Sequence, residues 1–233
     1  MPNLSTITLR RLLTGLTCLL IAKVVVLTLV SYRDYVPPDF HADFLFGREP
    51  YFYGSYAWAF YVHIFAGPVT LVLGVILLSN RFRLRFPRWH RILGRVQAVC
   101  VLFFLAPSGL WMARWAMTGA MAGSSFAMLS IATGLCVALG WRAAVQRRFA
   151  VHQRWMQRCF VLLCSAVVIR VMGGLTIVTA ADAPWIYPLS SWLSWTVPLL
   201  IYETLRPRKP TMPRDPETPI AKDETGTVAR ATG

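Results

Sequence analysis

Residues 159–180 read CFVLLCSAVVIRVMGGLTIVTA, an apolar run in which Arg170 is the single charged residue. A helix of about 20 apolar residues crosses the hydrocarbon core of a bilayer, so this run predicts a transmembrane helix. A charge at bilayer depth costs roughly 2.5–3.5 kcal/mol on insertion scales, and it is retained where it faces a protein interior or a wet cavity. Arg170 therefore predicts something polar at the centre of the membrane domain.

Five further runs of this kind lie on either side of it. They cover about residues 12–31, 58–79, 92–112, 120–141 and 185–205. The chain has 233 residues, is 56% hydrophobic and has a mean hydropathy of +0.51, more apolar than the surface of a soluble domain tolerates. The sequence predicts an all-α polytopic membrane protein with one transmembrane domain, residues 1–205, whose six helices include a four-helix core.

The distribution of charge predicts the orientation of these helices. The segments Arg81–Arg95 and Arg142–Arg158 carry several arginines and no acidic residue, which assigns both to the cytoplasmic side by the positive-inside rule. In the loop Arg33–Phe52 acidic residues outnumber basic ones, so that loop is expected outside. Six helices with both termini in the cytoplasm satisfy these biases and predict a multi-pass protein of the inner membrane.

The formal net charge of +14 follows largely from these arginine-rich loops. They are expected to contact anionic lipid headgroups, at about 1 kcal/mol per basic residue near the surface. A nucleic-acid partner would need a basic soluble domain, which the sequence does not offer. Residues 206–233 instead carry a proline at every third position from Pro207 to Pro219, which predicts an extended, disordered cytoplasmic tail.

His90 and His152 each stand at the cytoplasmic start of a predicted helix. If the third and fifth helices are neighbours, the two imidazoles lie at one depth and are able to bind one haem b iron axially. Gly94 lies one turn after His90, where a missing side chain lets a flat macrocycle approach, and nearby arginines would pair with its propionates. The alternative is that both histidines are interfacial residues that contact lipid phosphates.

Three more polar residues, His63, Lys23 and Arg170, fall inside predicted helices. Arg170 and His152 are five helical turns apart, so both are expected on one stripe of the fifth helix. Lys23 and Arg170 together favour an anion in a cavity. Arg170 by itself is also able to bind a quinone carbonyl there. Alternatively, Arg170 is a structural clasp between helices and Lys23 extends its amine to the interface.

The outer loop contains Asp39-Phe40-His41-Ala42-Asp43. In an extended strand Asp39, His41 and Asp43 would point the same way and would be able to bind a divalent metal. A solvated acidic loop explains the same residues without a metal.

Three motifs follow one another in the middle of the chain. They are Tyr61-Val62-His63, then His90-Arg91-Ile92-Leu93-Gly94-Arg95, then His152-Gln153-Arg154-Trp155-Met156 with Arg158 and Arg170. In this pattern, over about Phe60 to Gly174, the chain is similar to a family of predicted bacterial inner-membrane proteins of unknown function. More distantly, histidines on a four-helix membrane core resemble the b-type cytochromes and transmembrane ferric reductases, which implies haem. Those families carry two matched histidine pairs on the same two helices, and this chain does not.

Three functions therefore remain open from the sequence. The first is a membrane electron-transfer protein with haem b on His90 and His152. The second is a small-anion or proton-linked transporter with Lys23 and Arg170 at the midplane and His63 as a gate. The third is a structural or accessory membrane subunit without a cofactor. The redox protein must be coloured, whereas the other two need not be.

Overall fold

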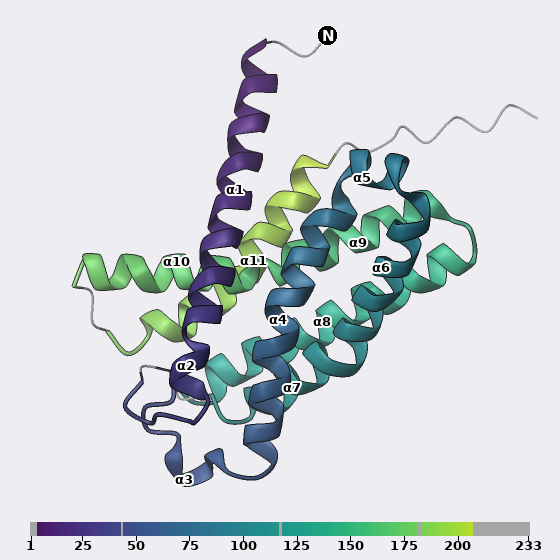
Figure 1. Cartoon of the computed structure of the whole chain (residues 1–233). Helices are drawn as coiled ribbons and strands as arrows, with labels where there is room; N and C mark the ends of the chain where they lie inside the picture. The colour runs from purple at the N-terminus through teal and green to yellow at the C-terminus, as the bar shows by residue number, and fades with distance from the viewer. Residues whose placement is uncertain (1–3, 43, 117, 181–182, 207–233) are drawn as a thin grey trace, which may run out of the picture.

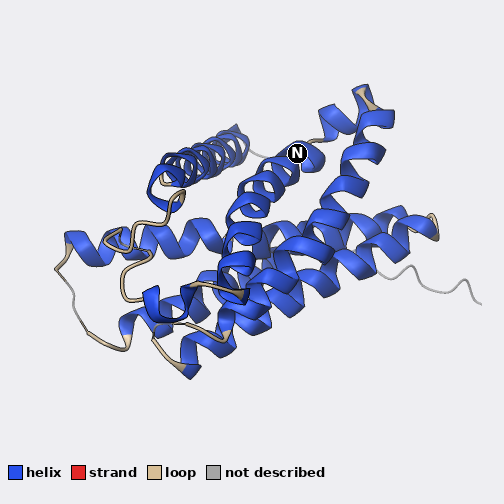
Figure 2. Cartoon of the chain, turned by 60° about the horizontal axis from the view of Figure 1, so that its bottom comes forward, coloured by secondary structure: helices blue, strands red, loops and turns tan. Residues whose placement is uncertain are grey.

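The computed structural model describes residues 4–42, 44–116, 118–180 and 183–206. In this part of the chain every regular element is a helix (Figure 2), which confirms the predicted all-α class. Five helical segments are long and apolar enough to cross a membrane. They are Leu12–Tyr35, Ser55–Leu78, Pro87–Ala113, Ala120–Val145 and Phe149–Val178. The protein is thus a multi-span membrane protein embedded in lipid.

Short helices and one π-helical segment divide these spans into the elements labelled in Figure 1. In chain order they are α1 (Leu4–Val30), α2 (Tyr32–Tyr35), α3 (Glu49–Phe52), α4 (Ser55–Leu78), α5 (Asn80–Arg85), α6 (Pro87–Val99), the π-helix η1 (Cys100–Leu105), α7 (Ala106–Ala113), α8 (Ala120–Val145), α9 (Phe149–Leu163), α10 (Ser165–Val178) and α11 (Ile186–Leu205).

The sixth predicted span corresponds to α11, which forms a helix at the expected place but is less apolar than the other five. Ser190, Ser191 and Ser194 lower its hydropathy, and all three are buried in the protein. Their side chains do not face lipid, because Ser191 and Ser194 each donate a hydrogen bond to a carbonyl one turn earlier. Whether α11 crosses the membrane is therefore still a prediction.

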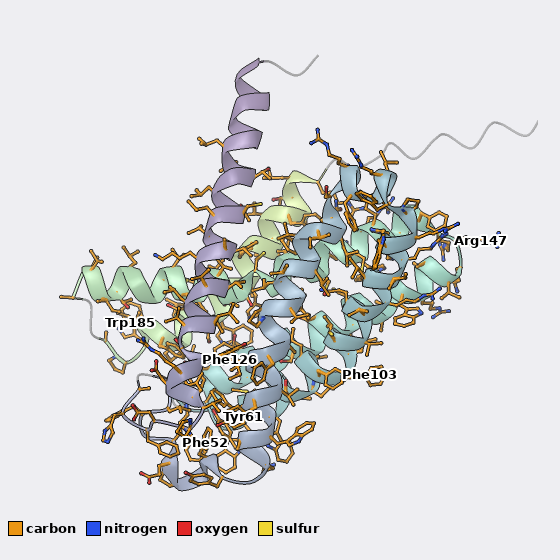
Figure 3. The ribbon with its side chains drawn as sticks, in the orientation of Figure 1. Phe52, Tyr61, Phe103, Phe126, Arg147 and Trp185 are labelled. Carbon is orange, nitrogen blue, oxygen red and sulfur yellow. The ribbon has the colours of Figure 1, made fainter. Side chains whose placement is uncertain are left out.

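The elements are arranged with two distinct ends. Figure 1 places the start of α1, the end of α11 and α5 at one end of the molecule and α2 and α3 at the other. The arginine-rich turn between α8 and α9 lies away from the outer loop: Figure 3 shows Arg147 far from Phe52 and Tyr61. This separation of arginine-rich turns from the acidic loop matches the charge pattern that predicts the orientation.

The third span begins at Pro87 and changes its winding in the middle. Proline suits the first turn of a helix, where its missing N–H leaves no bond unmade, so α6 starts five residues before the predicted boundary at residue 92. The π-helical segment η1 comes immediately before Pro107. Because Pro107 has no N–H to donate and its ring crowds the preceding turn, the helix widens there instead of continuing as a regular α-helix.

The fifth span is not one straight helix. It begins at Phe149 rather than Cys159, and it divides at Cys164 into α9 and α10. Cys164 has φ −66° and ψ −10°, and the changed ψ turns the next peptide out of regular helical geometry. Figure 1 shows α10 running across the direction of α1 and α4. His152 and Arg170 thus belong to two helical segments of one span, and the single stripe that would join them is still a prediction.

A buried apolar cluster joins the long helices. It includes Ile21 of α1, Leu71 of α4, Val101 of η1, Leu162 of α9 and Trp195 of α11. The Trp195 indole also donates to the Ser125 hydroxyl of α8, at 3.0 Å. Helices α1 and α11 also contribute to this cluster, so the structure does not single out four of the helices as a core. The four-helix core is therefore still a prediction.

Candidate functional site

The structure brings His90 and His152 within electrostatic range of each other, at the starts of α6 and α9. His90 lies in the first turn of α6 and His152 in the first turn of α9. The two imidazoles are close enough to interact electrostatically, and Arg83 adds its field to the same place. The two histidines come from different helices, α6 and α9, each of which packs against α8 rather than against the other.

Hydrogen bonding fixes the tautomer of one of these imidazoles. His152 Nδ1 lies 2.9 Å from the carbonyl oxygen of Gly140 on α8. A carbonyl only accepts, so Nδ1 carries the proton and Nε2 keeps its lone pair. A histidine whose Nδ1–H is held by a carbonyl in this way is oriented to give Nε2 to a metal.

The other imidazole lacks a partner. His90 Nδ1 is buried and makes no hydrogen bond within the described residues, and the same is true of Gln97 Oε1. His90 and Gln97 are two helical turns apart on α6, so both unpaired atoms lie on one face. Between them is Gly94, where an added Cβ would meet no atom within 4 Å. This face of α6 combines unpaired polar atoms with unfilled space.

Close packing of α8 on α9 sets the height of His152. An added Cβ at Gly140 would lie 3.2 Å from Trp155 Cβ and would overlap the end of the Met156 side chain. The absent side chain lets α9 approach α8, and the carbonyl of the same residue then reaches His152. Gly140 thus allows the close contact between α8 and α9 and also provides the carbonyl that binds the His152 imidazole.

A second polar region lies deeper in the membrane domain. A cavity of about 110 Å³ is bordered by α4, the η1–α7 region, α8, α9 and the start of α10. Its polar lining residues are His63, Thr70, Ser130, Thr133 and Ser165. Neither His90 nor His152 borders this cavity, so the two polar regions are separate.

His63 is held by α7. Its Nδ1 lies 3.2 Å from the Ser108 hydroxyl, which is also within hydrogen-bond distance of the Phe104 and Leu105 carbonyls. An added Cβ at Gly109 would lie 3.1 Å from His63 Cε1 and 2.7 Å from Ser130 Oγ. Only glycine at position 109 leaves room for the imidazole between α7 and α8.

The two cations of the predicted helices, Lys23 and Arg170, reach the surface of the chain, although protein surrounds much of Arg170. Arg170 and Lys23 are both exposed on the surface of the chain. Arg170 Nη1 donates to the carbonyl of Ala166, one turn earlier in α10, at 3.0 Å. This partner belongs to its own helix, while Tyr35 and Tyr187 of other elements are near enough to interact with Arg170 electrostatically, so the clasp between helices is still a prediction. Ala166 nevertheless borders the cavity, and Arg170 is near enough to His63 to interact with it electrostatically.

The outer loop does not form an extended strand. Asp39 Oδ1 accepts a hydrogen bond from the His41 backbone N–H at 2.9 Å, which folds the segment into a turn. Asp43 lies outside the described residues, and within those residues no three His, Cys, Asp or Glu side chains come together as a metal site. The predicted alternation of three ligands on one face of a strand is therefore wrong, because the Asx turn redirects the chain.

Sequence reasoning missed Ser108, Gly109, Ser130 and Gln97. Their partners are distant in the chain: His63 and Ser108 are 45 residues apart, and Gln97 donates to the Thr70 carbonyl across 27 residues. A local signal exists for two of them. Proline followed by Ser108 and Gly109 inside an apolar helix indicates irregular winding and a close approach of another group.

Residues 60–205 match the sequence profile of a family described as "Predicted membrane protein (DUF2306)". The chain belongs to this family. The matched segment runs from within α4 to the end of α11 and contains His63, His90, His152 and Arg170. No curated protein and no solved structure matched the chain.

Membership of DUF2306 confirms the predicted resemblance to membrane proteins of unknown function. The family description states a location and no activity, so it assigns no role to any histidine. The molecular role must be argued from the geometry of the two polar regions.

Proposed function

We propose that this protein is an electron-transfer protein of the inner membrane that binds haem b through His90 and His152. The observation that supports it best is the approach of the two imidazoles across an open face of α6. His152 Nδ1–H donates to the Gly140 carbonyl oxygen, and the buried His90 Nδ1 has no hydrogen-bond partner within the described residues. A lipid-facing or phosphate-binding histidine has no need of either feature.

The residues around the pair fit a haem. Gly94 leaves space for a flat ring against α6, and His152 Nε2 is free to serve as an axial ligand. When bound, a haem supplies a reversible one-electron couple. Arg91 and Arg95 flank the glycine on the exposed side of α6 and would pair with the propionates. The chain's own residues would hold the haem through the two imidazoles, leave room for it at Gly94 and neutralise its carboxylates with arginine side chains.

We further propose six membrane crossings with both termini in the cytoplasm and the outer loop on the other side. The charge distribution and the common end shared by α5, the start of α1 and the end of α11 support this topology (Figure 1). Alkaline phosphatase, active only outside the cytoplasm, is expected to be active when fused after Gly47 and inactive when fused after Arg206. Activity at Arg206 would mean that α11 does not cross the membrane, or crosses in the opposite sense.

The haem proposal is tested by a dithionite-reduced minus air-oxidised visible spectrum of the whole protein. It should be made in haem-replete cells and purified in detergent. A sharp α-band with haem close to one per chain is the expected result. A flat spectrum from folded protein would retire the redox function and favour an accessory subunit or a transporter.

A further inference from the structure

The cavity beside His63 presents a defined set of hydrogen-bonding groups. Ser108 has one hydroxyl proton, and the Phe104 and Leu105 carbonyls beside it only accept, so that proton goes to a carbonyl. The Ser108 oxygen must then accept from His63, which puts the imidazole proton on Nδ1. In this neutral tautomer His63 Nε2 is an acceptor, and no described side chain donates to it.

Two serine hydroxyls complete the set. Ser130 and Ser165 border the cavity and make no side-chain hydrogen bond with any described residue, so their protons are available. Thr70 and Thr133 donate to carbonyls of their own helices and offer only their oxygen lone pairs. The cavity therefore offers one strong acceptor and two hydroxyl donors on an otherwise mostly apolar lining.

The size of the cavity limits the occupant. Its volume is about 110 Å³. An enclosed apolar cavity of about 150 Å³ binds benzene, so this smaller space holds most of one six-membered ring and leaves the remainder at its open side. A ring that satisfies this lining must carry a hydroxyl for His63 and an oxygen that accepts from a serine.

We propose that this cavity binds the ring of a single-ring hydroquinone, the headgroup class of membrane-soluble quinols. One ring hydroxyl donates to His63 Nε2, and the oxygen across the ring accepts from Ser130 or Ser165. Arg170 lies beside the same wall, through its bond to the Ala166 carbonyl. The haem site and this site share none of the residues argued to bind, so either proposal stands or fails without the other.

The structure offers a variant that fills the cavity without disturbing its walls. Gly67 borders the cavity, and an added Cβ there meets no atom within 4 Å. Gly67→Leu places a side chain into the space that the ring would occupy. Gly173→Leu is the matched control, because Gly173 has the same open surroundings and does not border the cavity.

The test is equilibrium binding of a radiolabelled short-chain benzoquinol, under argon, to the full chain in nanodiscs, with empty nanodiscs subtracted. Saturable binding at one per chain is expected for the wild type and Gly173→Leu, and at least a tenfold weaker affinity for Gly67→Leu. Ser130→Ala combined with Ser165→Ala should weaken binding about 3- to 10-fold, the usual effect of one lost hydrogen bond. Ser124→Ala, on the same helix as Ser130 and outside the cavity, should change nothing.

Two outcomes would overturn the proposal. One is the absence of saturable binding by the wild type, which would leave the cavity as a site for water only. The other is unchanged binding by Gly67→Leu in protein whose thermal unfolding matches the wild type. Haem measured on the same samples separates the two proposals: quinol binding without haem rejects the proposed function alone, and haem without quinol binding rejects this inference alone.

Discussion

His90→Ala and His152→Ala are each expected to abolish the haem α-band completely, rather than to halve it. Both imidazoles are needed for six-coordinate, low-spin iron, and a haem held by one ligand in a site built for two is lost in detergent. The expected haem content falls from about one per chain to below a tenth in either variant. Reduced-minus-oxidised spectra and the pyridine haemochrome assay measure it.

Controls in this chain make that result specific. His41 is exposed in the outer loop, so His41→Ala should keep the full band. Gly94→Leu retains both histidines and fills the open face of α6, so it should also lose haem if the ring lies there. Loss of the band in only one of the two histidine variants would exclude axial ligation by this pair.

A folding defect must be separated from ligand loss. His90 makes no hydrogen bond through Nδ1 within the described residues, so alanine at this position removes no buried bond from that atom. His152→Ala releases the Gly140 carbonyl and should cost about 1 kcal/mol of stability, the usual net value of one hydrogen bond. Unfolding temperatures of the two apo-variants are therefore expected to differ slightly, while their spectra are alike.

The sequence predicts the membrane class well because length and hydropathy act locally. The runs near residues 58–79 and 120–141 lie within Ser55–Leu78 and Ala120–Val145 apart from one residue, since each continuous apolar segment must be a helix in lipid. The charges of the loops also predict a common depth for His90 and His152, and the two imidazoles do lie within electrostatic range of each other. Features that depend on the surroundings of a single residue are harder to predict from the sequence.

The division of the fifth span illustrates that limit. The helix is interrupted at Cys164, and no proline or glycine lies beside this residue. The sequence therefore carries no local signal that separates α9 from α10. The cost of a charge in lipid predicts a polar partner for Arg170, but that partner is a carbonyl one turn earlier in the same helix, which no sequence pattern specifies. The His63–Ser108 contact joins residues 45 positions apart, just beyond the π-helical segment, and no local pattern specifies such a pair.

Gly140→Leu is expected to destabilise the whole membrane domain, by about 1–3 kcal/mol or more, because it overpacks the α8–α9 contact. The added side chain would meet Trp155 Cβ, which is fixed to the α9 backbone and cannot rotate away, as well as the flexible Met156. Relief requires α9 to move outward, which also withdraws His152 from the Gly140 carbonyl.

Gly134→Leu on the same helix is a suitable comparison. An added Cβ at Gly134 meets only Ala106 Cβ, at an ordinary contact distance of 3.6 Å, so a much smaller loss is expected there. Thermal unfolding in detergent and the amount of protein in the membrane measure both variants. Equal stability of Gly140→Leu and wild type would mean that α8 and α9 do not pack as closely as described. The geometry argued for His152 would then lose its basis, because the same contact holds that imidazole in place.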